Sequence, residues 1–208
     1  MILNITNFQE LYRKLTFRNI YERVRYRKVI VLTYKRTVGG KEYTNSNIEI
    51  KVVTNNNVND ALIYEPPLKV QAFKRFLDKG DCGFYAYSNG RFIHRSWVTF
   101  GPKKEPQWNR YAPIELNEGD AYIHWCETVP WARGMGVYPD VLNHILDVLS
   151  DQANEFYIST TSDNVASRNG IKKAGFCFVT GCEVTTFCGL NIEKHLGKEK
   201  LIECGEYQ

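Results

Sequence analysis

The sequence has no long apolar run. No stretch approaches the eighteen or so apolar residues that a membrane-spanning helix needs. The N-terminal segment, Met-Ile-Leu-Asn-Ile-Thr-Asn, turns polar too early for a signal peptide. We therefore expect a cytoplasmic protein with no membrane partner.

Paired cysteine motifs are also missing. The six cysteines include no Cys-x-x-Cys pair, so neither a zinc site nor a disulfide framework is expected, and no metal is predicted. Free or buried thiols in a reducing compartment are the better interpretation. The sequence has no internal repeat and no low-complexity linker.

The 208 residues, 43% of them hydrophobic, suffice for one packed domain or for one domain with an extension. The net charge is only +4, but residues 1–50 hold ten Lys and Arg against four Asp and Glu. Interleaved tyrosines make this basic part a candidate nucleic-acid surface. A simpler interpretation of these basic residues is the solvent-exposed face of a helix over 7–27. A third interpretation is a surface that binds an acidic partner or substrate.

A strand, a glycine loop and a helix follow one another over residues 121–149. The strand is expected from Ala121 to Thr128, and the helix near Tyr138 with Pro139 in its first turn, where a missing N–H costs nothing. Apolar residues then recur at helical spacing. They are Val141, Leu142, Ile145, Leu146 and Leu149.

The loop before this helix is suited to an anion. First-turn N–H groups have no acceptor within a helix, and the helix dipole favours negative charge at that end. Gly134 and Gly136 allow close approach of a phosphate to the backbone. Arg133 adds a donor fork that suits a phosphate.

Two segments resemble the motifs of one family. Arg133-Gly-Met-Gly136-Val-Tyr138 resembles the pyrophosphate loop of the GNAT (GCN5-related) acetyltransferases, which reads Arg/Gln-x-x-Gly-x-Gly/Ala. Asn164-Val-Ala-Ser167, followed by Lys173-Ala-Gly-Phe176, looks like the family's next motif, an Asn that opens a helix ending in Gly-Phe. The resemblance covers about residues 69–187.

The resemblance implies an α+β GNAT fold, with a central mixed, mostly antiparallel sheet, a splayed parallel strand pair and flanking helices. It implies an N-acyltransferase that moves an acetyl or short acyl group from acyl-CoA to an amine by direct transfer in a ternary complex. Acetyl-CoA or a related acyl-CoA is the implied cosubstrate. The implied cofactor-binding residues are Cys126, Thr128, Val129, Arg133, Gly134, Met135, Gly136, Val137, Tyr138 and Asn164.

The remaining pattern predicts further elements. They are a strand over 28–35 returning through Gly39-Gly40 as a strand over 48–54, a helix over 66–78, a hairpin of 83–88 and 91–99 around Asn89-Gly90, a strand over 155–161 parallel to the strand over 121–128, and a final antiparallel pair, 176–180 and 183–187. We divide the chain into an N-terminal extension or first elements (1–65), a GNAT core (66–190) and a charged tail (191–208) with little core content.

Catalysis by such a protein needs a base for the incoming amine. Strand alternation places Tyr122, His124, Cys126 and Thr128 on one face, which by analogy with the family points to the reacting centre. His124 is the first candidate base, against the alternative of a structural strand histidine. Glu127, on the opposite face, is the second. Cys126 is a nucleophile or, more simply, a small buried side chain, and we expect structural or solvated roles for the other histidines, His94, His144 and His195.

Two positions depart from the family pattern. Tyr138 replaces a small residue, so its side chain must turn away from the phosphates. Ile171 stands where many members carry a tyrosine that protonates the leaving thiolate, so either another group, such as Tyr122 or Tyr157, supplies that proton or the thiolate leaves unassisted.

The acceptor is expected to be a small-molecule or peptide amine. The long loop over 101–119 offers Trp108 and Tyr111 as an acceptor lid or is only an excursion, and Trp125 is the third candidate for substrate binding. The alternative function is a non-catalytic GNAT-like domain that binds CoA or nucleic acid through the basic N-terminal region. The sequence does not decide whether the protein forms a homodimer.

Overall fold

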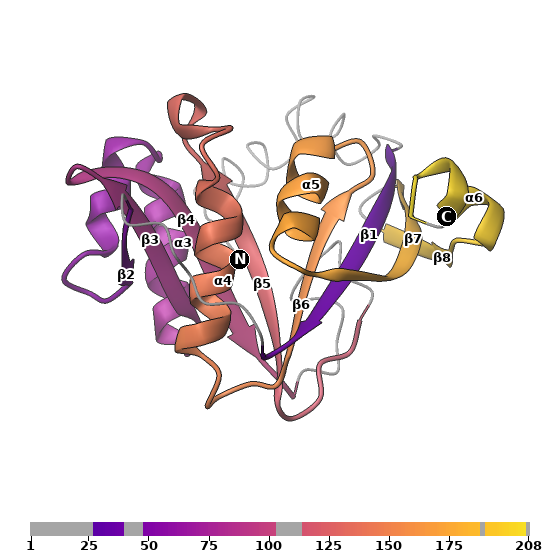
Figure 1. Cartoon of the computed structure of the whole chain (residues 1–208), viewed down its shortest axis with the longest axis horizontal. Coiled ribbons are helices and arrows are strands. Elements are labelled where there is room, and N and C mark those ends of the chain that lie inside the picture. Colours follow the sequence, from indigo (N-terminus) through magenta and orange to yellow (C-terminus); the bar gives the residue numbers. More distant parts are fainter. Residues whose placement is uncertain (1–26, 40–47, 103–113, 188–189, 207–208) are drawn as a thin grey trace, which may run out of the picture.

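One sheet of eight strands organises the molecule (Figure 1). The computed structural model describes residues 27–39, 48–102, 114–187 and 190–206. The strand order is β2-β3-β4-β5-β6-β1-β7-β8, and within the described residues every neighbouring pair is antiparallel except β5 and β6. The strands are β1 (Arg27–Thr37), β2 (Glu49–Val52), β3 (Cys82–Ser88), β4 (Arg91–Phe100), β5 (Asp120–Thr128), β6 (Glu155–Thr161), β7 (Cys177–Phe187) and β8 (Leu190–His195). The predicted mixed, mostly antiparallel sheet is confirmed.

Helices cover both faces of this sheet. Figure 1 shows α4 and α5 in front of it and α3 behind it. The helices are α3 (Pro67–Asp78), α4 (Val137–Val148), α5 (Val165–Lys173) and α6 (Lys198–Glu203), with short 3₁₀ turns η1 (Val58–Ile63) and η3 (Pro130–Ala132). The five apolar positions predicted to face the core from the helix that is now α4 are all buried. None of the helices in the described part of the chain is long and apolar enough to cross a membrane.

Strand β1 lies in the interior of the sheet. It pairs with β6 on one side and β7 on the other, whereas β2 pairs with β3 at the sheet edge. The predicted pairing of 28–35 with 48–54 is therefore wrong. The physical reason is burial, because four consecutive residues of β1 are almost fully buried, a pattern typical of a strand covered on both faces. They are Val31, Leu32, Thr33 and Tyr34.

The C-terminal part also differs from its prediction. A single strand, β7, runs through Gly181 where two strands and a turn were expected. A Cβ on Gly181 would lie 2.6 Å from Cδ2 of Leu201 in α6. This glycine therefore marks a close approach of two elements rather than a turn. The predicted tail with little core content contains β8 and α6, and Leu201 is buried.

Glu206 fastens the C-terminal segment to α5. Its buried carboxylate accepts a hydrogen bond from Tyr34 (2.5 Å) and lies 2.6 Å from Nη2 of Arg168 and 2.9 Å from Nζ of Lys172. Burial alone would raise the pKa of Glu206, but the hydrogen bonds from Tyr34, Lys172 and Arg168 outweigh it and hold the pKa below its usual value. Glu206 thereby fixes one side of α5, which forms a wall of the site described next.

Candidate functional site

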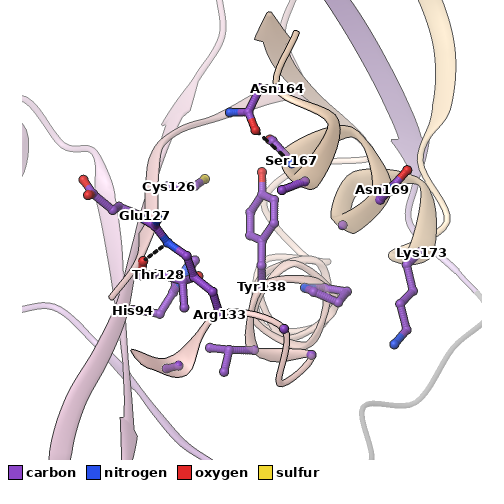
Figure 2. A pocket seen from close by; sticks show the side chains of 17 residues that line it. His94, Cys126, Glu127, Thr128, Arg133, Tyr138, Asn164, Ser167, Asn169 and Lys173 are labelled. Atoms are coloured by element: carbon purple, nitrogen blue, oxygen red, sulfur yellow. Dashed lines mark hydrogen bonds between the residues drawn. The ribbon is translucent and has the colours of Figure 1, made fainter. Parts of the chain in front are cut away.

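A gap opens in the sheet between β5 and β6. The two strands pair only from Asp120–Glu155 to Ile123–Ile158, although β5 runs on to Thr128 and β6 to Thr161. On the side of α4 and α5 this gap leads into a cavity of about 650 Å³, which we call the first cavity (Figure 2). Its lining comprises His94, Cys126, Glu127, Thr128, Ala132, Arg133, Gly134, Gly136, Val137, Tyr138, Pro139, Asn164, Ala166, Ser167, Asn169, Gly170 and Lys173.

The glycine loop forms one end of the first cavity. Gly134 and Gly136 have φ angles of 80° and 79°, a conformation that L side chains rarely adopt. Gly136 is the N-cap of α4 and provides no side chain to bond the first-turn N–H groups, which also have no acceptor within the helix. Arg133 Nε donates to the Thr128 carbonyl at 3.1 Å, which steadies the guanidinium beside the loop. This end of the cavity is suited to a phosphate group.

Helix α5 forms the opposite wall. The Asn164 side chain accepts a hydrogen bond from the Ser167 amide at 3.1 Å and caps the helix, as its sequence position predicts. Gly170 and Lys173 follow at a spacing of three residues and so share a helix face with Ser167. Lys173 brings a second positive charge to the first cavity. Lys173 belongs to the Lys-Ala-Gly-Phe motif, but no role in binding was predicted for it.

Strand β5 carries a β-bulge beside the gap. Its register with β4 shifts by one residue between His124 and Glu127, and Trp125 has a φ of 50°. Arg95 donates a hydrogen bond to the Trp125 carbonyl. Such a bulge adds one residue to one strand and reverses the alternation of the side chains beyond it.

The bulge overturns the predicted alternation. Thr128 pairs with His94 on the sheet face covered by α4, whereas His124 pairs with Trp97 on the face covered by α3. Glu127 also lies on the α3 face, opposite Arg95. The prediction of a single face for Tyr122, His124, Cys126 and Thr128 is therefore wrong.

A second cavity of about 330 Å³ opens at the same gap. It is lined by Val31, Tyr122, Ile123, His124, Trp125, Cys126, Tyr138, Ile158, Ser159, Thr160, Thr161, Asn164 and Ser167. It contains three of the four candidates on the α3 face, Tyr122, His124 and Trp125, but not Glu127. The two cavities share four lining residues, Cys126, Tyr138, Asn164 and Ser167. Two ligands that enter from opposite faces of the sheet would therefore come into contact at these four residues.

His124 is held among aromatic rings in this second cavity. Its ring lies 5.2 Å from that of Phe76 and 6.4 Å from that of Tyr122. Its buried Nε2 makes no hydrogen bond within the described part of the chain, and the Asp81 carboxylate is 3.6 Å away. The Trp125 side chain is 44% exposed and packs its ring against Phe76.

Other predicted residues fall outside the cavities. Val129 is buried, and its amide donates to the Ile93 carbonyl at 2.9 Å. Met135 is 60% exposed and lines neither cavity. Trp108 and Tyr111 lie outside the described residues, as does the basic segment before residue 27.

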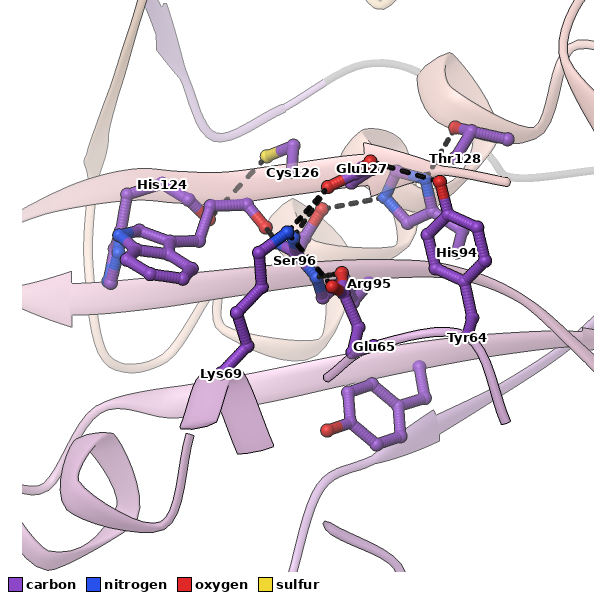
Figure 3. Close-up of polar contacts among 12 residues, drawn as sticks. Tyr64, Glu65, Lys69, His94, Arg95, Ser96, His124, Cys126, Glu127 and Thr128 are labelled. Carbon is purple, nitrogen blue, oxygen red and sulfur yellow. Dashed lines mark hydrogen bonds and ion pairs between the residues drawn. The ribbon is translucent and has the colours of Figure 1, made fainter. Parts of the chain in front are cut away.

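Glu127 belongs to a network of charges on the α3 face (Figure 3). Arg95 Nη2 lies 2.6 Å from Glu127 and Arg95 Nε lies 2.5 Å from Glu65. Tyr64 donates to Glu127 at 3.1 Å, and Lys69 lies 2.9 Å from Glu65. With its carboxylate already bonded to a guanidinium and a phenol, Glu127 is a less available proton acceptor than His124.

Replacing Arg95 with methionine should lower the free energy of unfolding by about 3–5 kcal/mol, because it leaves the buried Glu65 with only Lys69. Burial alone would raise the pKa of Glu65, but the bonds from Lys69 and Arg95 hold it below its usual value. The ionised Glu65 therefore contributes fully to the free energy of unfolding at neutral pH. This contribution is lost as the pH falls through the pKa of Glu65 in the folded protein. Urea denaturation at several pH values measures it.

Two further variants control this prediction. Lys51→Met removes an exposed pair with Glu49 and should change the stability by at most about 1 kcal/mol. Adding Glu65→Gln to the Arg95 variant should restore part of the loss, since no unpaired charge stays buried. Equal effects of Arg95→Met and Lys51→Met would contradict the account.

His94 lines the first cavity, which the sequence analysis did not anticipate. It is fully buried, with Nδ1 2.7 Å from the Thr128 hydroxyl and Nε2 2.8 Å from the Ser96 hydroxyl. Burial lowers the pKa of His94 to about 3, so its ring is neutral at physiological pH. It comes from β4, far from both motifs in sequence, and only the pairing of β4 with β5 brings it to the site.

Cys126 is better explained as a buried side chain than as a nucleophile. Burial raises the pKa of its thiol to about 11, so the thiol is protonated at neutral pH. Within the described residues, no group of three or more His, Cys, Asp or Glu side chains could hold a metal ion.

The mixed sheet with its one parallel pair and its flanking helices has the fold of solved GNAT acetyltransferases. No protein-family model matches the sequence, and no curated protein matches it. A solved GNAT-family acetyltransferase from Colwellia psychrerythraea is 18% identical, with a TM-score of 0.56 over 87% of this chain and 61% of that chain. A proposed GNAT acetyltransferase from Novosphingobium aromaticivorans is 16% identical, with a TM-score of 0.53 over 77% of this chain and 65% of that chain.

A third similar structure is the GCN5-related glucosamine N-acetyltransferase region of a fungal multi-domain β-N-acetylglucosaminidase. It is 12% identical, with a TM-score of 0.58 over 88% of this chain and 23% of that chain. The chain thus spans about three fifths of the length of the Colwellia protein and under a quarter of the fungal one. At these identities the comparisons confirm the predicted fold, and the activity has to be argued from the site.

Proposed function

We propose that this protein is an N-acyltransferase that moves an acetyl or short acyl group from acyl-CoA to an amine within a ternary complex. The main support is the meeting of two cavities through the gap between β5 and β6. A donor and an acceptor that enter from opposite faces of the sheet would contact each other at that gap. Holding two reactants in this way removes much of the entropic barrier to their reaction.

The donor would occupy the first cavity. Its pyrophosphate would accept hydrogen bonds from the amides of the glycine loop and from Arg133, with Lys173 on the opposite wall. Beyond Ile123 the edge of β5 has no partner in β6, so its backbone can bond the pantetheine chain. The thioester would then lie near Cys126 and Asn164, where the two cavities join.

The acceptor amine would occupy the second cavity. Trp125 offers an exposed ring there, and Ser159 and Thr161 line the β6 side. His124 is the base that we propose for removing the amine proton, because the residue lines this cavity and its Nε2 makes no hydrogen bond to the described residues. Glu127 would contribute negative charge at the rim, and Tyr122 would support the His124 ring.

The test is release of free CoA thiol from acetyl-CoA in the presence of a panel of amines that includes amino sugars and peptides with free N-termini. We expect release that depends on one class of amine, with the acetylated amine identified by mass spectrometry. Protein carrying Gly134→Trp serves as the inactive control. CoA binding without release for any amine would instead favour a binding domain without catalysis.

A further inference from the structure

Tyr138 stands where the two cavities join. It is the second residue of α4, and its ring points from α4 towards Ser167 of α5 (Figure 2). A Cβ at position 170 would lie 2.6 Å from Cδ1 of this ring, so the ring fills the space that Gly170 leaves. The centroid of the His94 ring, from β4, lies 5.7 Å from that of the Tyr138 ring. The ring is therefore held in one orientation, turned away from the glycine loop as the sequence requires.

The hydroxyl of Tyr138 is placed among polar groups at this junction. Ser167 and Cys126 are its polar neighbours, and all three residues line both cavities. Burial raises the pKa of Tyr138 well above its usual value. At neutral pH the phenol is therefore protonated, and its O–H can donate a hydrogen bond.

We propose that the Tyr138 hydroxyl is the proton donor to the sulfur atom that leaves the acyl group, an assignment that rests on the proposed acyl transfer. The hydroxyl lies on the wall that both reactants must face, close to where the thioester would lie. It can donate in a direction set by the packing of the ring against Gly170 and His94.

The step balances in protons and electrons. The amine nitrogen forms a bond to the carbonyl carbon and loses one proton to the base, and the carbon–sulfur bond breaks with its electron pair going to sulfur. The phenolic O–H proton then moves to sulfur and gives the CoA thiol. The resulting phenolate recovers a proton from solvent, so the net reaction converts an amine and an acyl thioester to an amide and a thiol.

The experiment measures the pKa of the CoA thiol while CoA is bound. Thiolate absorbance is titrated in the complex and corrected with the titration of free protein, for the wild type and for Tyr138→Phe. A hydroxyl that donates to sulfur stabilises the thiolate, so at a given pH below the pKa the wild-type complex should hold about tenfold more thiolate than the variant. Tyr87→Phe is the control, because Tyr87 has a buried hydroxyl that donates to Asp60 far from both cavities.

Activity provides a second readout. Tyr138→Phe keeps the ring, so its affinity for CoA should stay within about threefold while kcat falls roughly 10²-fold or more. If CoA binds both proteins and its thiol titrates identically in them, the proton-donor assignment is overturned and the acyl-CoA site stands. If CoA does not bind the wild-type protein, the proposed function falls and takes this assignment with it.

Discussion

Replacing Gly134 with tryptophan is expected to abolish CoA binding, with a loss of at least about 10²-fold in affinity. Gly134 lines the first cavity and has a φ of 80°, a conformation that tryptophan rarely adopts, so the substitution should distort the loop and place a large side chain beside the space assigned to the pyrophosphate. A 10²-fold loss is about 2.7 kcal/mol, which corresponds to one or two hydrogen bonds to a charged group. Isothermal titration with CoA measures it.

Gly90 provides a matched control for this substitution. It has a φ of 73°, also has nothing within 4 Å of its Cβ position, and lies in the turn between β3 and β4. Gly90→Trp carries a similar backbone strain, about 1–2 kcal/mol, but should bind CoA normally. Retained binding by the Gly134 variant would refute the assignment of the loop, and equal losses in both variants would indicate a general effect on folding.

Replacing His124 with alanine should lower kcat by roughly 10²–10⁴-fold, the range for loss of a positioned general base. CoA affinity should be unchanged because His124 lies on the other face of the sheet from the first cavity. The variant should also lose the rising limb of the pH–rate profile. Steady-state kinetics across pH, with the acceptor found by the thiol-release assay, measures both effects.

His195 is the control for this variant. It is exposed on β8, away from both cavities, so His195→Ala should keep the wild-type rate and pH profile. A His124→Ala protein with an unchanged rate and pH profile would eliminate His124 as the base. Glu127 would then be the next residue to test.

Local features were predictable from the sequence because their causes are local. The Asn89-Gly90 turn selects a hairpin, and the structure has one between β3 and β4. The Pro139 and Gly136 positions indicate where α4 begins, and Asn164 caps α5 as expected. These features place the glycine loop and one wall of the first cavity.

Features that depend on distant partners were not predictable. The bulge at Trp125 exists only in the register between β5 and β4, and it moves His124 to the face opposite Thr128. His94 reaches the first cavity through that same pairing. Gly181 was predicted to lie in a turn because glycine is common in turns. Its actual role, close packing against Leu201, depends on a residue twenty positions away in the sequence.

The role of Tyr138 shows the same limit. The sequence required its ring to turn away from the phosphates, but the direction depends on the space above Gly170, in a different helix. Only the packing of α4 against α5 shows that the ring points towards Ser167.

Backbone amide shifts of isotopically labelled protein during a titration with CoA test most directly whether the helix end binds the diphosphate. The amides of residues 134–138 should show the largest changes, with smaller ones along the free edge of β5. If the chemical shifts of these five amides do not change, either because CoA binds elsewhere or because CoA does not bind, the account is contradicted.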